Sequence, residues 1–204
     1  MQKGIKNIIF DLGGVILPID ISRTTDSFKR LGVQNIEELF ALGHASSFFK
    51  ELEQGRINSV EFIDKVKNLV GQPLPDETII DAWNALILDF PQERIDLLRK
   101  LKEKYRLFLF SNTNLIHYRK FQQQIHIQTG CHLEELFEKT YYSHEIGLRK
   151  PDIASYQLII NENKLDASQT LFVDDAEVNI AGAKKAGLHG LHIVPGTSIM
   201  EIEW

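Results

Sequence analysis

Asp11 stands at the first place in the sequence where a side chain could do chemistry. It ends an apolar run and precedes Gly13 and Gly14. Glycines let backbone N–H groups approach an anion closely, so a carboxylate at this turn could attack a phosphoryl group. An aspartate before glycine also begins many ordinary turns, and for this motif alone both interpretations stay open.

Two adjacent carboxylates, Asp174 and Asp175, follow a second apolar run. Each disfavours ionisation of the other unless a cation offsets their charges. Mg²⁺ suits such a site, because it is a hard cation that binds carboxylates, water and phosphate oxygens. The alternative is that Asp175 caps a helix while Asp174 is solvated.

Two further segments carry groups that could bind phosphate oxygens. Ser111 and Asn112 follow another apolar run and could donate hydrogen bonds, whereas Asn114 better suits the N-cap of the next helix. Arg149 and Lys150 lie at the expected start of a later helix, where the helix dipole favours an anion. A surface charge pair is the alternative for these two cations.

Short apolar runs alternate with helical patterns along the chain, which is typical of a parallel sheet covered on both faces. The predicted strands span residues 7–10, 106–110, 139–142, 170–173 and 190–194. Helices are expected from Pro91, from Pro151 and over residues 176–186, with Gly187 in the left-handed position that ends the last. The sequence therefore predicts an α/β, doubly wound (Rossmann-like) core. All four candidate groups would lie at one edge of its sheet.

Residues 17–90 differ from the rest because they contain amphipathic segments and no convincing strand. The apolar positions at helical spacing fall in three sets: Ile36, Leu39 and Phe40; Val60, Ile63, Val66, Leu69 and Val70; Ile79, Ala82, Trp83, Leu86 and Ile87. Ligands bind at the carboxyl ends of strands in such folds, so we expect a helical cap at 17–90 above a core of 1–16 and 91–204. The alternative is one more layer of the core.

The specificity of such a cap would come from its side chains, whose orientation the sequence leaves open. The candidates are His44, Phe48, Phe49 and Lys50. Packing or solvated surface is the alternative for each of them.

Composition narrows the class of protein. The 204 residues are 43% hydrophobic and 25% charged, and no apolar run is long enough to cross a membrane or to act as a signal peptide. We therefore expect a cytoplasmic protein with no membrane partner. The net charge of −5 and the scattered basic residues predict no nucleic-acid partner. The single cysteine, Cys131, excludes an intrachain disulfide and fits an inert thiol. No pattern defines an oligomeric state.

Taken together, the motifs resemble the haloacid dehalogenase-like (HAD) hydrolase superfamily over nearly the whole chain. Its four motifs are matched in order by Phe10-Asp11-Leu12-Gly13-Gly14-Val15, by Ser111-Asn112, by Lys150 within Gly147-Leu148-Arg149-Lys150-Pro151-Asp152, and by Val173-Asp174-Asp175. The cap after the first strand resembles one subclass of this superfamily. Finer details resemble the bacterial α-glucose-1-phosphatase branch, namely His117 after Ser111-Asn112-Thr113-Asn114, Tyr156 after Pro151, and Asn179-Ile180 with Gly182-Ala183.

This resemblance implies a Mg²⁺-dependent phosphatase that acts on a small phosphorylated metabolite. Asp11 would be the nucleophile that forms an aspartyl-phosphate, with Lys150 as the second catalytic residue. The implied substrate-binding residues are Leu12, Gly13, Ser111, Asn112 and Lys150. The implied metal ligands are Asp11, the backbone carbonyl of Gly13, and Asp174 or Asp175.

Two other functions remain open at this point. A 2-haloacid dehalogenase would also use Asp11, but against carbon and without a metal. A regulatory module would bind a phosphorylated ligand without turnover.

One position departs from the superfamily pattern. Most of its phosphatases carry a second Asp two residues after the nucleophile as the general acid and base, and here that residue is Gly13. General acid–base catalysis contributes about 10²- to 10⁴-fold in rate. We therefore expect slow turnover or a good leaving group, such as that of a hexose 1-phosphate, unless a neighbour such as His117 donates the proton.

Overall fold

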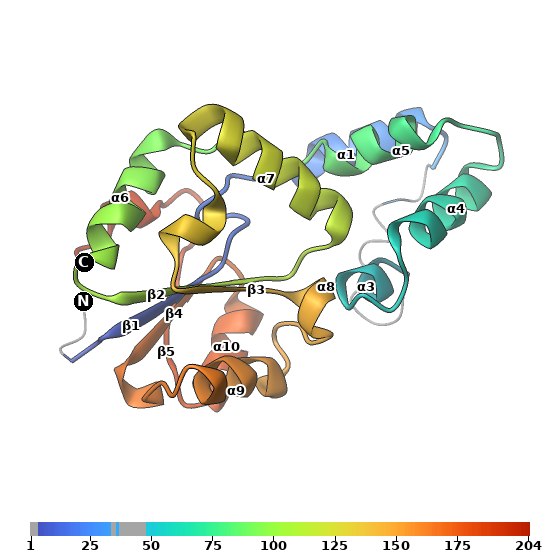
Figure 1. Cartoon of the computed structure of the whole chain (residues 1–204). Coiled ribbons are helices and arrows are strands. Elements are labelled where there is room, and N and C mark those ends of the chain that lie inside the picture. Colours follow the sequence, from blue (N-terminus) through green and yellow to red (C-terminus); the bar gives the residue numbers. More distant parts are fainter. Residues whose placement is uncertain (1–3, 34–35, 37–47) are drawn as a thin grey trace.

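The computed structural model describes residues 4–33, 36 and 48–204. Five parallel strands form one sheet in the order β3-β2-β1-β4-β5 (Figure 1). They are β1 (Asn7–Phe10), β2 (Arg106–Ser111), β3 (Lys139–Tyr142), β4 (Thr170–Asp174) and β5 (His189–His192). All five were predicted, but β5 ends two residues earlier than expected, because Val194 is exposed and leaves the sheet before Gly196.

The first strand lies at the centre of the sheet, between β2 and β4. Phe10 is in register with Leu109 on one side and with Val173 on the other, so the three strands end at nearly the same level. The side chains of β1 alternate between two cores: Ile8 and Phe10 pack on one face, and Ile9 packs on the other. The residues that follow these strands are therefore brought together at one edge.

Helices cover both faces of the sheet, which confirms the doubly wound fold. On one face lie α6 (Gln92–Lys102) and α7 (Leu115–Thr129), and on the other lie α9 (Ile153–Glu162) and α10 (Glu177–Lys185) (Figure 1). The remaining core elements are short: η1 (Leu133–Leu136), α8 (Ser143–Ile146), η2 (Ala167–Gln169) and η3 (Ile199–Glu201).

The helix ends are set by the local signals of the sequence. Asn114 caps α7, since its side-chain oxygen accepts hydrogen bonds from the backbone N–H groups of Ile116 and His117 at 3.1 Å each. Gly187 takes the expected left-handed conformation after α10, with φ +92°. The cap residue of α10 is Ala176 and not Asp175, so the interpretation of Asp175 as an N-cap is wrong.

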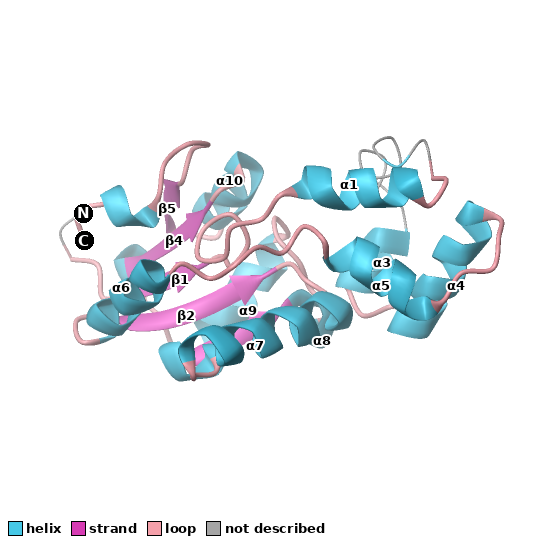
Figure 2. Cartoon of the chain, turned by 90° about the horizontal axis from the view of Figure 1, so that it is seen from above, coloured by secondary structure: helices cyan, strands magenta, loops and turns pink. Residues whose placement is uncertain are grey.

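A group of helices stands beyond the carboxyl ends of the strands, where the strand arrows point in Figure 2. These are α1 (Ile21–Arg30), α3 (Phe48–Glu53), α4 (Ser59–Val70) and α5 (Asp76–Asn84). They share a hydrophobic cluster that includes Phe28, Phe62 and Trp83 and reaches Ile116 at the start of α7. Leu86 and Ile87 do not extend α5 as predicted, because α5 ends at Asn84. The predicted positions Leu39, Phe40 and His44 lie outside the described residues.

Two chain segments connect the core with these helices, and they pair with each other. Ile19 forms an antiparallel bridge with Ile87. Asp20 donates its N–H to the carbonyl of Leu86 at 2.8 Å, and Leu88 donates to that of Pro18 at 3.2 Å. We propose that core and cap divide at this ribbon, close to the boundaries predicted at residues 17 and 90.

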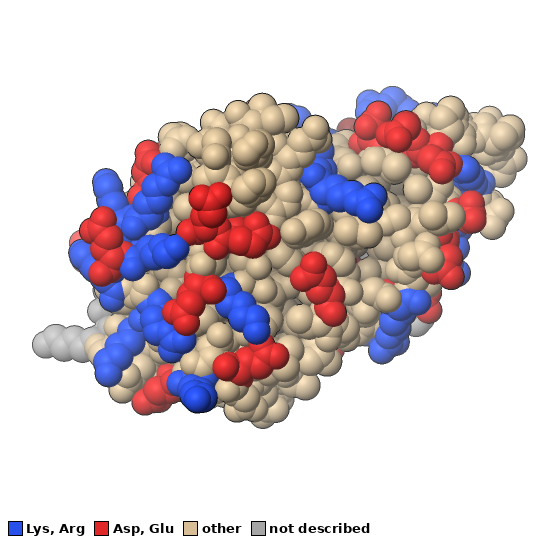
Figure 3. Space-filling view, viewed as in Figure 1, with Lys and Arg blue, Asp and Glu red and all other residues tan. Residues whose placement is uncertain are grey.

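Charges of both signs are interspersed over the face of the molecule shown in Figure 3. Among the described residues, no helix has both the length and the apolar character needed to cross a bilayer.

Gly182 provides a test of the packing between α9, α10 and the turn that follows Lys150. A Cβ at Gly182 would lie 2.5 Å from the carbonyl oxygen of Pro151 and 3.1 Å from the ring of Tyr156. Alanine is normally better than glycine inside a helix by about 1 kcal/mol, but overpacking costs about 1–3 kcal/mol. We expect Gly182→Ala to lower the free energy of unfolding measured with urea. A stabilised variant would show that this packing is loose.

Candidate active site

Asp11 is the first residue after the central strand, and its backbone and side chain are both fixed. Its N–H donates to the carbonyl of Val173 at 2.8 Å, which continues the pairing of β1 with β4. Its Oδ1 accepts a hydrogen bond from the N–H of Leu12 at 2.7 Å. The side chain is buried. The carboxylate therefore lies at the carboxyl edge of the sheet with one oxygen already held by the backbone.

Lys150 connects Asp11 with Asp174. Its Nζ lies 2.7 Å from Asp11 Oδ1 and 2.7 Å from Asp174 Oδ2. The side chain is only 1% exposed, and a buried ammonium is costly unless it is paired. Burial alone would lower the pKa of Lys150, but the two carboxylates outweigh it and raise the pKa above its usual value. Lys150 is therefore a fixed positive charge inside the site.

Asn112 and two aromatic rings hold Lys150 in place. The side-chain amide of Asn112 donates to the carbonyl of Lys150 at 3.0 Å and accepts from its N–H at 2.9 Å. The rings of Phe110 on β2 and Phe172 on β4, the two strands that flank β1, each have their centroid 5.5 Å from Nζ. The residue that directly follows β2 thus helps to set the position of the lysine.

Asp174 has two hydrogen bonds at each carboxylate oxygen. Oδ1 accepts from the N–H of Ala176 and from Asn179, and Oδ2 accepts from Asn179 and Lys150. Asn179 is itself placed by Tyr156, whose hydroxyl donates to its backbone carbonyl at 2.8 Å. This tightly held carboxylate anchors Lys150 from the side opposite Asp11.

Three carboxylates lie close enough to share a cation. Asp11, Asp174 and Asp175 each offer an oxygen within 4.8 Å of the others. Burial raises the pKa of Asp11 to about 7, with Lys150 opposing the rise and Asp174 adding to it. Burial and Asp174 also raise the pKa of Asp175. Because a divalent cation would stabilise all three in the ionised form, this donor set fits a hard metal ion.

Gly14 allows Asp175 to lie against the loop that carries Asp11. Its φ is +77°, and a Cβ there would overlap the carboxylate of Asp175. Gly13 has no such conformation, and a Cβ at Gly13 would lie in ordinary contact with Ile19, 3.4 Å from its Cδ1.

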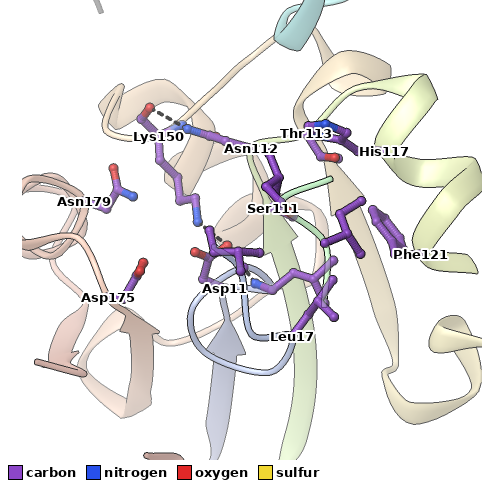
Figure 4. Close-up of a pocket in the computed structure, with 15 residues that line it drawn as sticks. Asp11, Leu17, Ser111, Asn112, Thr113, His117, Phe121, Lys150, Asp175 and Asn179 are labelled. Atoms are coloured by element: carbon purple, nitrogen blue, oxygen red, sulfur yellow. Dashed lines mark hydrogen bonds and ion pairs between the residues drawn. The ribbon is translucent and has the colours of Figure 1, made fainter. Parts of the chain in front are cut away.

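A cavity of about 170 Å³ opens above Asp11. In Figure 4, Asp175 and Asn179 lie on one side of it, and Leu17, Phe121 and His117 lie on the other. The predicted residues on its wall are Asp11, Leu12, Gly13, Ser111, Asn112, Lys150 and Asp175. The predicted Asp174 is not part of the wall but lies behind Lys150.

Several wall residues were missed in the sequence. They are Leu17, Ile19, Leu86, Ile87, Thr113 and Phe121. Four of them belong to the paired connections between core and cap, whose pairing no local pattern indicates. The only sequence feature that could have indicated these wall residues is that apolar residues flank the predicted boundaries of the cap.

Some predicted candidates lie away from the cavity. Phe49 packs into the hydrophobic cluster of the cap, and Phe48 stacks on it with ring centroids 4.3 Å apart. Lys50 is half-buried on α3 and does not line the cavity. Arg149 points to the cap, where its guanidinium pairs with Glu53 at 2.8 Å.

His117 lines the cavity, but both of its ring nitrogens have partners. Nε2 lies 3.0 Å from the carbonyl oxygen of Trp83, and Nδ1 lies 3.1 Å from the amide nitrogen of Asn114. A carbonyl can only accept, so Nε2 carries the proton and Nδ1 accepts from Asn114. Burial lowers the pKa of His117 to about 4. The ring therefore joins α7 to α5, and neither nitrogen is free to protonate a leaving group.

The sequence of residues 5–187 matches the haloacid dehalogenase-like hydrolase family. The chain belongs to this family.

Characterised relatives align over most of the chain. A D-ribitol-5-phosphate phosphatase of Bacteroides thetaiotaomicron is 31% identical, over 90% of this chain and 89% of the relative. A sesquiterpene phosphatase of Aspergillus oryzae is 26% identical, over 92% and 89%.

Solved structures agree with this assignment. A HAD family enzyme of Bacteroides thetaiotaomicron, solved in complex with magnesium and inorganic phosphate, superposes with a TM-score of 0.89 at 36% identity, covering 96% of this chain and 98% of that chain. An L-2-haloacid dehalogenase of Xanthobacter autotrophicus shares the fold alone, at 18% identity, a TM-score of 0.61 and coverage of 93% and 77%.

The buried imidazole of His117 predicts a pH dependence of stability. Between pH 6.5 and about 4 the unfolded chain binds a proton at His117 and the folded chain does not. As the pH is lowered through this window, the free energy of unfolding should therefore decrease by about 2–3 kcal/mol because of this group. His117→Phe keeps a ring against Trp83 but has no titrating group. Urea titrations at several pH values should show that its free energy of unfolding depends less on pH than that of wild type in this window. The same pH dependence of the free energy of unfolding in both proteins would contradict the assignment of a neutral His117.

Proposed function

We propose that the protein is a Mg²⁺-dependent phosphatase of a small phosphorylated metabolite, with Asp11 as the covalent nucleophile. The observation that carries this proposal is the bridge of Lys150 between Asp11 and Asp174, at 2.7 Å on each side. This bridge lies at the wall of the cavity, within reach of a third carboxylate, Asp175. A dehalogenase, which attacks carbon, has no need for three carboxylates around one point.

Asp11 performs both chemical steps in this proposal. Lys150 and the N–H of Leu12 hold Oδ1, which leaves Oδ2 as the oxygen that attacks phosphorus. The bond from phosphorus to the ester oxygen breaks, and the leaving group takes the electron pair. Water then attacks the phosphorus of the aspartyl-phosphate, releases phosphate and restores the Asp11 carboxylate.

The other wall residues would bind the phosphoryl group. Lys150 and the hydroxyl of Ser111 can donate hydrogen bonds to its oxygens, together with the N–H of Gly13. The N–H of Leu12 is already donated to Asp11 Oδ1, so Leu12 contributes by holding the nucleophile beside the phosphoryl group. Both atoms of the Asn112 amide are engaged with Lys150. The contribution of Asn112 to the substrate is therefore a backbone contact.

The metal ligands in this proposal are Asp11, the backbone carbonyl of Gly13, and Asp175 together with or in place of Asp174. Of the two adjacent aspartates, Asp175 is the one that lines the cavity. A bound Mg²⁺ would neutralise charge on the phosphoryl oxygens and keep Asp11 ionised at neutral pH.

The size of the cavity and the named relatives support a small phosphate monoester as the substrate. D-ribitol 5-phosphate, the substrate named for the bacterial relative, is a polyol ester of a primary alcohol. A hexose 1-phosphate has a better leaving group and is the second candidate, because Gly13 leaves the loop without an acid.

A screen for phosphate release tests the proposal. Wild type should release phosphate from p-nitrophenyl phosphate and from at least one sugar or polyol phosphate in the presence of Mg²⁺, and a chelator should abolish the release. Asp11→Asn is nearly isosteric but cannot attack phosphorus, so we expect a loss of at least about 10³-fold, in a protein that stays folded because Asp174 still pairs with Lys150. Binding of phosphate and Mg²⁺ without any turnover would instead indicate the regulatory module.

Gly13 generates a second prediction, because it leaves the loop without a general acid. The rate of aspartyl-phosphate formation should fall steeply as the pKa of the leaving group rises, so aryl and anomeric phosphates should outrun primary alkyl phosphates. Gly13→Asp introduces no left-handed strain, since the positive φ in this loop belongs to Gly14 and not to Gly13. It should flatten this dependence and raise the rate for alkyl esters by about 10²-fold. Single-turnover rates for a graded ester series measure both effects, and a shallow dependence in wild type would show that another group is the acid.

A further inference from the structure

Arg149 directly precedes the catalytic Lys150, yet its side chain leads away from the cavity. Its guanidinium contacts Glu53 on the cap helix α3 through two nitrogens, with Nε at 3.1 Å and Nη2 at 2.8 Å from Oε2. The two side chains are 12% and 28% exposed. By contrast, the Arg106–Glu138 pair, which lies on the surface of the core domain, has both side chains more than 40% exposed.

A second contact lies beside this pair. Gly55 follows α3 with φ +65°, and a Cβ there would overlap the backbone carbonyl of His144 on α8. Figures 1 and 2 both show α3 next to α8. The cap backbone is therefore packed directly against the core at this point, which is far along the chain from the Ile19–Ile87 ribbon.

The loop of residues 149–150 thus has contacts in two directions. The side chain of Lys150 reaches Asp11 and Asp174, and its backbone is held by Asn112. The preceding residue, Arg149, reaches the cap. The cap helix α3 is therefore linked through Arg149 to the loop that carries Lys150, while the lysine keeps its own separate contacts.

We propose that Glu53, Arg149 and the close contact of Gly55 with His144 form a seat that holds the cap closed on the core, and that Arg149 is a positioning residue. The ribbon at Ile19 and Ile87 would be the fixed side of the cap, and the seat its releasable side. Because the seat adjoins the loop of Lys150, closing it places the leaving-group side of the substrate against the phosphoryl site. The kinetic consequence rests on the proposed phosphatase function, whereas the contact itself does not.

A double-mutant cycle tests the seat with two readouts. The proteins are wild type, Glu53→Ala, Arg149→Ala and the double variant, with Arg149→Lys as the conservative variant. The first readout is amide hydrogen exchange over residues 48–57, which requires no turnover. The second is KM and kcat for D-ribitol 5-phosphate, compared with acetyl phosphate, whose leaving group is too small to extend far into the cap.

Each single variant should lose about threefold to tenfold in exchange protection over residues 48–57, the range for a partly buried ion pair. KM for the polyol ester should rise by a similar factor, with kcat and the acetyl phosphate parameters within twofold of wild type. The double variant should be no worse than either single variant, and Arg149→Lys should recover part of the loss. Arg106→Ala, which breaks an Arg–Glu pair on the surface of the core domain, should leave the exchange protection of residues 48–57 unchanged.

Unchanged exchange in both single variants, or losses that multiply in the double variant, would overturn the seat. If wild type hydrolyses no phosphate ester, the proposed function fails, and the exchange cycle still decides whether the seat exists. A KM effect equal for both substrates would show that Arg149 acts on Lys150 alone and not through the cap.

Discussion

The site depends on one buried ammonium held between two buried carboxylates. Lys150 Nζ bridges Asp11 and Asp174 in a region where an isolated charge would be very costly. Without the lysine, burial and mutual repulsion would favour protonated carboxyl groups, and a protonated Asp11 cannot attack phosphorus. The pKa of Asp11 is about 7 even with Lys150 present, so a bound metal cation would complete the charge balance that the lysine begins.

The fold can be understood as the means of holding this bridge. The parallel register of β1 with β2 and β4 places Asp11 level with Asp174, and Ser111 follows one residue further along β2. Asn112 fixes the backbone of Lys150, and Asn179 fixes the carboxylate of Asp174. Each of these contacts satisfies a buried polar group while fixing its direction, and this preorganisation is what electrostatic catalysis needs.

The sequence predicted the parts of the structure that depend on local patterns. Asp11, Asp174 and Lys150 could be found because apolar runs and helix starts placed them at one edge of a parallel sheet, and Asn114 could be assigned to a helix cap from its residue type. The boundaries of β5 and α5 were less accurate, because tertiary packing decides where Val194 and Leu86 leave their elements.

Contacts between distant segments could not be predicted from the sequence. The apolar cavity wall depends on the pairing of Ile19 with Ile87, and the position of Arg149 depends on a partner 96 residues away. His117 was a candidate acid by residue type, but the carbonyl of Trp83 and the amide of Asn114 occupy both of its nitrogens. A side chain's type therefore indicated what it could do, and only the fold showed which partners were left to it.

In the proposed reaction Asp11 is phosphorylated during turnover, and this species can be trapped. Wild type mixed with Mg²⁺ and p-nitrophenyl phosphate should be quenched in acid on the millisecond scale, digested, and analysed by mass spectrometry. We expect one phosphoryl group on the peptide that contains Asp11, formed as fast as the first p-nitrophenol is released and absent from Asp11→Asn. Turnover without a phosphorylated peptide at any quench time, or with the phosphoryl group on another residue, would show that Asp11 is not the nucleophile.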